Sequence, residues 1–287
     1  MSILLIIASC LAATLYVAAW LGAANRTPPA ALAPDAGPVP VRRLDAGTLL
    51  LAAGVVSHGV AMHAAIAAGG GGVRFGFGPA LSATFWVGVA VLWFEGLSVR
   101  AEALRTAVLP AAAVAVLLPL FFPGSVYATE SHRPLFIPHL VVGTLAYGVL
   151  MLAALHAALM TAAERALHGA PGASSSIFAR WLEELPPLLV LERILFRFIA
   201  VGFVLLTLTA VSGIAFSEQV FGRPLRLEHK SVFTIAAWAL FGVLLVGRAR
   251  WGWRGRTALR LTLAGFFVLL LAYVGSRFVI EVVLQRA

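Results

Sequence analysis

Histidines are the side chains in this chain best suited to chemistry, because a neutral imidazole can bind a metal and titrates near neutral pH. His139 follows Pro138 within the segment SHRPLFIPHLVVGTLAY, residues 131–147. Proline suits the first turn of a helix, where its missing N–H costs little, so an apolar helix can begin here. The pattern therefore predicts a metal-competent imidazole at the start of a long apolar helix.

His229 has a similar setting, since it lies in the segment LEHKS directly before another apolar run. Two neutral imidazoles from different helices at matching depth are what a six-coordinate haem iron requires. We therefore predict His139 and His229 as the metal ligands of a haem b. The single cysteine, Cys10, leaves no CxxC pair and no CxxCH site, so the haem is expected to be non-covalent.

Three other side chains are secondary candidates for cofactor binding. His58 and His63 share one apolar run, and their spacing turns the rings about 140° apart on a helix, so they cannot ligate one small ion together. For each, a histidine hydrogen-bonded between helices is an equal alternative. Arg277 is expected either to pair with Glu281, four residues later, or to meet a haem propionate.

The elements that must position these residues are membrane helices. The chain has 287 residues, of which 61% are hydrophobic and 11% charged, and its mean hydropathy is +0.97, which excludes a soluble domain. Its apolar runs approach the length of about 20 residues that crosses a bilayer, and they do not alternate as barrel strands do. The runs are roughly Ser2–Gly22, Gly47–Ala68, Pro79–Leu97, Leu104–Phe122, Leu135–Ala162, Phe196–Phe216, Ser231–Val246 and Leu261–Val279. We predict an all-α polytopic membrane protein with about eight transmembrane helices, one integral domain over residues 1–287.

The basic residues predict the orientation of these helices. The net charge of +9 could suggest nucleic acid, but the basic residues lie in short loops between the apolar runs, so we expect no nucleic-acid partner. Fourteen Lys and Arg residues fall in the odd-numbered loops and five in the even-numbered loops. By the positive-inside rule, the odd loops are cytoplasmic. We therefore predict a multi-pass protein of the bacterial inner membrane with both termini periplasmic, so that His139, His229 and His63 lie near the outer face.

Two loops have distinctive compositions. The segment at about 163–192 combines apolar and charged residues in an amphipathic pattern and is predicted to lie on the cytoplasmic membrane surface. The outer segment from Gly69 to Gly78 is rich in glycine but lacks the strand-then-helix setting of a nucleotide loop, so it is interpreted as a flexible turn.

With these residues in view, the chain resembles the CcsA-like cytochrome c assembly family, in its YpjD/HemX-like inner-membrane branch. The resemblance runs through His58 and through the segments at 139–159, 186–213, 229–238, 252–256 and 272–281. It implies a protein of eight or more spans that moves or presents haem during cytochrome c maturation, with other maturation proteins as partners. It also implies an outer histidine at His139 and a deep one at His58. The tryptophan-rich WWD segment of the family is absent: FGRPLRLEHK stands in its place, which favours haem binding or a scaffold role over a haem-ligase partnership.

Two classes of function remain open from the sequence. The first is a haem-binding accessory protein of cytochrome c biogenesis, embedded in the lipid bilayer. The second is a transport component, for example an accessory to divalent-cation (Mg or Co) efflux, although the apolar runs hold few of the carboxylates that hard cations need. No nucleophile and base occur at a plausible spacing and no HExxH motif is present, so we do not expect an enzyme.

Overall fold

The structure is a computed structural model that describes residues 2–24, 46–67, 70–95, 102–128, 133–167, 188–221 and 228–285. These ranges contain eight helices that are long and apolar enough to cross a membrane. Large apolar side chains cover their outer surfaces, for example Ile3 and Phe121, which are 76% and 73% exposed. Such surfaces need lipid rather than water around them. The prediction of an all-α polytopic membrane protein is confirmed.

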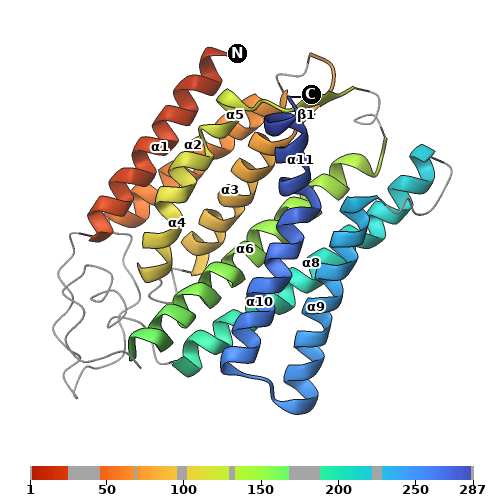
Figure 1. Cartoon of the computed structure of the whole chain (residues 1–287). Coiled ribbons are helices and arrows are strands. Elements are labelled where there is room, and N and C mark those ends of the chain that lie inside the picture. Colours follow the sequence, from red (N-terminus) through yellow and green to blue (C-terminus); the bar gives the residue numbers. More distant parts are fainter. Residues whose placement is uncertain are drawn as a thin grey trace.

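The helices form a single bundle with neighbouring helices side by side (Figure 1). In chain order they are α1 (Ile3–Ala24), α2 (Ala46–Ala67), α3 (Phe77–Glu95), α4 (Glu102–Ala115), α5 (Leu118–Phe121), α6 (Phe136–Leu167), α8 (Leu188–Phe221), α9 (His229–Trp251) and α10 (Gly255–Leu270). The last helix continues through a π-helical turn (Leu271–Gly275), α11 (Ser276–Phe278) and a second π-helical turn (Val279–Val283).

The fourth crossing is interrupted where the sequence predicted one continuous run. α4 ends at Ala115, and α5 begins at Leu118, after two intervening residues, with Pro119 in its first turn. A proline has no backbone N–H to donate to the preceding turn, so the helix breaks before it. The two pieces still make a single crossing from Leu104 to Phe121.

α6 is the central helix of the bundle, because it packs against α3, α4, α8 and α10. Leu150 and Leu152 of this helix are completely buried. Gly148 lets α3 approach closely: a Cβ atom there would lie 2.6 Å from Cβ of Val87. The helix that carries His139 near its N-terminal end is therefore fixed by neighbours from both halves of the chain.

A short antiparallel ribbon lies at the end of the bundle that also holds both termini (Figure 1). β1 (Val73–Phe75) pairs with β2 (Ser125–Tyr127), with Arg74 opposite Val126. The expectation of a flexible glycine-rich turn was wrong for these residues. Glycine permits the pairing, since Gly124 has a φ of +77° and a Cβ there would lie 2.6 Å from the carbonyl oxygen of Phe75.

The predicted amphipathic segment at 163–192 is described only at its two edges. Its first residues complete α6, and its last residues begin α8. Residues 168–187 lie outside the described ranges. The predicted surface helix within them stays a prediction.

Candidate functional site

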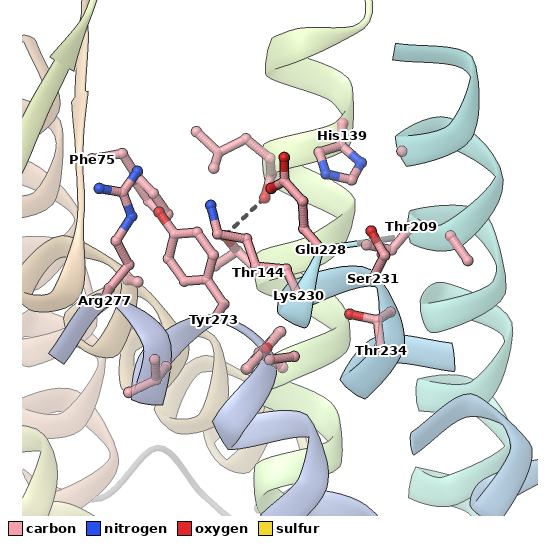
Figure 2. A pocket seen from close by; sticks show the side chains of 18 of the residues that line it. Phe75, His139, Thr144, Thr209, Glu228, Lys230, Ser231, Thr234, Tyr273 and Arg277 are labelled. Atoms are coloured by element: carbon pink, nitrogen blue, oxygen red, sulfur yellow. Dashed lines mark hydrogen bonds between the residues drawn. The ribbon is translucent and has the colours of Figure 1, made fainter. Parts of the chain in front are cut away.

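A cavity of about 380 Å³ opens at the ribbon end of the bundle, between α6, α8, α9 and the π-helical part of the last helix. Its volume lies in the range of small-molecule and cofactor sites. Most of its wall surface is apolar or aromatic, and polar and charged side chains also line it: Thr84, His139, Thr144, Thr209, Ser217, Glu228, Lys230, Ser231, Thr234 and Arg277. Figure 2 shows ten of the lining residues labelled, with His139 and Arg277 on opposite sides of the space. We call this space the outer cavity, because the sequence predicts that His139 lies near the outer face.

His139 is held on the cavity wall by the facing segment of α8. Its Nδ1 lies 2.9 Å from Oγ of Ser212, and the Ser212 hydroxyl donates to the carbonyl oxygen of Thr209 at 3.1 Å. Depending on the tautomer of the ring, either Nδ1–H donates to the Ser212 hydroxyl or that hydroxyl donates to Nδ1. The α8 backbone comes close at Gly213, where a Cβ would lie 3.1 Å from Cε1 of the ring.

Arg277 lies on the other side of the outer cavity. Its Nη1 contacts Oε1 of Glu281 at 3.3 Å and Oγ of Ser125 at 3.4 Å, and its guanidinium carbon lies 5.8 Å from the ring centre of Tyr273. The predicted i,i+4 pairing with Glu281 is therefore present. The Nε of Arg277 is buried without a hydrogen-bond partner among the described residues. The guanidinium is thus held in place with one donor still unsatisfied.

Lys230 adds a second positive charge to the outer cavity, from the first turn of α9. Its Nζ lies 6.0 Å from the ring centre of Tyr273, and Figure 2 shows Lys230 and Tyr273 between Arg277 and His139. Glu228 lines the same space with a negative charge. The π-helical turn at Leu271–Gly275 presents Tyr273 to the cavity, and π-helical turns are frequent at functional sites.

The structure does not bring His229 to this cavity. His229 is exposed, whereas its two neighbours Glu228 and Lys230 line the space. Glu228 precedes α9 in an extended conformation, and Lys230 points about 100° away from His229 on the helix, so neither neighbour requires His229 to face the cavity. The geometry therefore does not support His139 and His229 as a facing pair, and the role of His229 as a ligand stays a prediction.

His58 and His63 also lie away from the outer cavity. His58 is completely buried between α1, α2 and α3, with Nδ1 3.1 Å from the hydroxyl of Tyr16 and Nε2 2.8 Å from Oγ of Ser82. Both ring nitrogens of His58 are therefore engaged by protein, as in the alternative of a histidine bonded between helices. His63 points about 140° away from His58 on the same helix, and it is exposed.

Sequence reasoning did not identify Ser212, Tyr273 and Lys230 as site residues. Each lies in a segment that carries the family resemblance, but only the packing of helices far apart in the chain shows which of these residues share a space. Even neighbouring residues differ: Lys230 lines the outer cavity, whereas His229 does not. Helix depth can be estimated from sequence, whereas helix rotation cannot.

Comparisons with known proteins agree with this architecture. Residues 48–284 match the family described as Cytochrome C assembly protein. The inner membrane protein YpjD of Escherichia coli is 32% identical over 166 residues, which cover 58% of this chain and 60% of that relative. The cytochrome c biogenesis protein CcsA of Prochlorococcus marinus is 34% identical over 88 residues, 31% of this chain and 28% of the relative. The aligned part of this chain thus spans about 60% of the length of YpjD. The family match covers most of the crossings and all of the outer cavity. This chain therefore belongs to the cytochrome c assembly protein family, as a membrane protein of its CcsA-like, YpjD-type branch.

Proposed function

We propose that this protein acts in cytochrome c biogenesis by binding haem b non-covalently in the outer cavity, with His139 as an axial ligand of the iron. The observation that carries the proposal is the arrangement of the cavity wall. The imidazole of His139 lies opposite the guanidinium of Arg277, and Lys230, Glu228 and the ring of Tyr273 lie between them. In this role haem is the cargo that the protein holds for cytochrome c maturation.

His139 has the chemistry of an iron ligand. Because Nδ1 contacts Ser212, Nε2 is the nitrogen expected to reach the iron. A hydrogen bond from the other ring nitrogen orients a ligating histidine and raises its basicity, and Ser212 supplies that bond here. Haem iron can be held by a single protein imidazole, since the porphyrin provides four further nitrogens.

Lys230 and Arg277 suit the two propionates of haem. An arginine fork binds a carboxylate through two parallel hydrogen bonds, and Arg277 has a buried, unsatisfied Nε. The rings of Phe75, Tyr127 and Tyr273 line the same cavity and offer flat apolar surfaces for a porphyrin. Imidazole, cations and aromatic walls are together the groups that such a molecule needs.

The proposed location follows from the distribution of charge. Both termini, the ribbon and the outer cavity lie at one end of the bundle, and the arginine-rich loop after α9 lies at the other end. The positive-inside rule assigns the arginine-rich end to the cytoplasm. We therefore place the outer cavity on the periplasmic side of the inner membrane.

The absorption spectrum of the purified protein tests the proposal. Protein from haem-replete cells, purified in detergent, is expected to show a Soret band that survives washing and is extracted by acidic acetone, as non-covalent haem is. His139→Ala should remove most of this band. His63→Ala is the matched control, because His63 is an exposed membrane histidine outside the cavity, and it should leave the band unchanged.

Two results would overturn the proposal. One is protein from haem-replete cells that carries no haem and does not bind added haemin. The other is a Soret band that His139→Ala and His63→Ala affect equally. His229→Ala belongs in the same series: a loss as large as that of His139→Ala would restore His229 as a second ligand.

A further inference from the structure

A second cavity lies at the opposite end of the bundle from the outer cavity, between the end of α6 and the start of α10. Its volume is about 440 Å³. Its lining residues are Thr161, Glu164 and Arg165 from α6, and Arg256, Leu259, Arg260 and Leu263 from α10. Three guanidinium groups and one carboxylate thus line the cavity, which gives it a net positive charge. We call it the arginine cavity.

The arginine cavity lies at the level where a membrane helix meets the lipid headgroups. Arg165 is the last residue of the fifth crossing, and Gly255, next to Arg256, is the first residue of the eighth. Trp251, the last residue of α9, stacks on Trp253 in the loop before α10, with ring centres 5.8 Å apart, and Trp251 is 67% exposed. Tryptophans of this kind are enriched at membrane interfaces.

The chemistry of the wall suits a phosphate that is attached to an apolar body. Guanidinium groups bind phosphate oxygens through paired hydrogen bonds, while Leu259 and Leu263 provide apolar wall below them. α10 begins beside the cavity at Gly255, and no side-chain cap satisfies its first N–H groups. The positive end of the helix dipole therefore adds to the attraction for an anion.

Glu164 reduces the attraction of the cavity for an anion, because its carboxylate is negatively charged. Its Oε2 lies 3.7 Å from Nε of Arg256, whose side chain is 70% exposed. The carboxylate therefore holds Arg256 at the cavity and repels an incoming anion at the same time. Removal of this charge should strengthen anion binding rather than weaken it.

We propose that the arginine cavity binds the phosphate headgroup of an anionic phospholipid from the surrounding leaflet. Basic pockets between membrane helices are known to bind such headgroups. The apolar wall and the interfacial depth favour a lipid over a free phosphate, because only a lipid supplies acyl chains at that depth. This inference does not depend on haem binding in the outer cavity.

Native mass spectrometry of delipidated protein in detergent tests the proposal. Phosphatidylglycerol is the probe, and phosphatidylcholine, which carries no net charge, is the reference lipid. Phosphatidylglycerol should bind more tightly, and Arg260→Gln should weaken its binding about fivefold, the effect expected for one arginine near an anionic surface. The matched control is Arg250→Gln, since Arg250 is an exposed arginine of α9 that does not line the cavity.

Glu164→Gln is a second test variant, and it should tighten phosphatidylglycerol binding. A gain of affinity cannot result from misfolding, because it requires a folded protein. Equal binding of the two lipids would overturn the proposal. So would an equal loss in Arg260→Gln and Arg250→Gln, which would indicate unspecific attraction. Displacement of phosphatidylglycerol by millimolar inorganic phosphate would assign the cavity to a soluble anion instead.

Discussion

At the scale of single residues, burial separates two kinds of membrane histidine. His139 lies on a cavity wall with Nδ1 at Ser212, whereas His58 is completely buried and has its two ring nitrogens at Tyr16 and Ser82. A polar side chain in a membrane helix has to be partnered, by protein or by a ligand. His58 meets this need inside the protein, whereas His139 lines a cavity of about 380 Å³.

Ser212 is a positioning residue within the proposed haem site. Its hydroxyl fixes the ring of His139, and loss of an outer partner of this kind typically weakens metal binding about 10- to 100-fold. Ser212→Ala should therefore weaken haemin binding in a titration followed at the Soret band, while the melting temperature changes little. Thr14→Val is the control, because the Thr14 hydroxyl bonds only within α1, at Cys10. Unchanged affinity in Ser212→Ala would show that the hydroxyl does not orient the ring.

His58 is expected to stabilise the packing of α1, α2 and α3. His58→Ala leaves the hydroxyls of Tyr16 and Ser82 unpaired beside a new void, so the free energy of unfolding should fall by about 2–4 kcal/mol. Tyr16→Phe removes one hydrogen bond and should cost about 1 kcal/mol. Thermal unfolding in detergent measures both, with the exposed His63→Ala as reference. A His58→Ala variant that stays folded below its melting temperature but no longer binds haemin would contradict a purely structural role.

At the scale of elements, close contacts between helices depend on glycine. Gly148 of α6 faces α3, where an added Cβ would lie 2.6 Å from Cβ of Val87 and 3.1 Å from the carbonyl oxygen of Thr84. Neither neighbour is the flexible end of a side chain, so the helices would have to separate. Separation of α6 from α3 would loosen the packing of the central helix.

Gly148→Ala should therefore lower the free energy of unfolding by about 1–3 kcal/mol, as overpacking does. Gly22→Ala is the matched control: Gly22 is also helical, but nothing lies within 4 Å of its added Cβ. That variant should unfold at the same temperature as the wild type or slightly higher, since alanine favours helix over glycine. Equal melting temperatures for the two variants would show that α3 and α6 can separate at little cost.

The outer ribbon joins elements that the sequence alone did not connect. Glu281, at the end of the last helix, accepts a hydrogen bond from the backbone N–H of Phe77 at 3.0 Å and pairs with Arg277, whose Nη1 reaches Ser125 on β2. The periodicity of apolar residues predicts each helix, because it is a local property of the chain. The pairing of β1 with β2 is not local, and two three-residue strands leave no recognisable pattern.

At the scale of the whole molecule, the number of crossings was predictable for a simple physical reason. A helix that spans about 30 Å of hydrocarbon needs about 20 apolar residues, and each such run is visible in the sequence. The rotation of each helix was not predictable, because lipid accepts apolar side chains on any face and the runs are apolar all round. The depth of His229 could therefore be anticipated, whereas its direction away from the outer cavity could not.

The two cavities lie at opposite ends of the bundle, so the orientation of the protein in the membrane decides which of them faces the periplasm. Cysteine labelling tests this orientation, after the lone Cys10 is replaced by Ser. Val126 on the ribbon and Thr257 at the start of α10 are exposed positions at opposite ends. In intact spheroplasts, a membrane-impermeant maleimide should label Val126→Cys and spare Thr257→Cys, which should react only after the membrane is opened. The reverse pattern would place the arginine cavity outside and the outer cavity in the cytoplasm, where the positive-inside rule does not allow an end with so few basic residues.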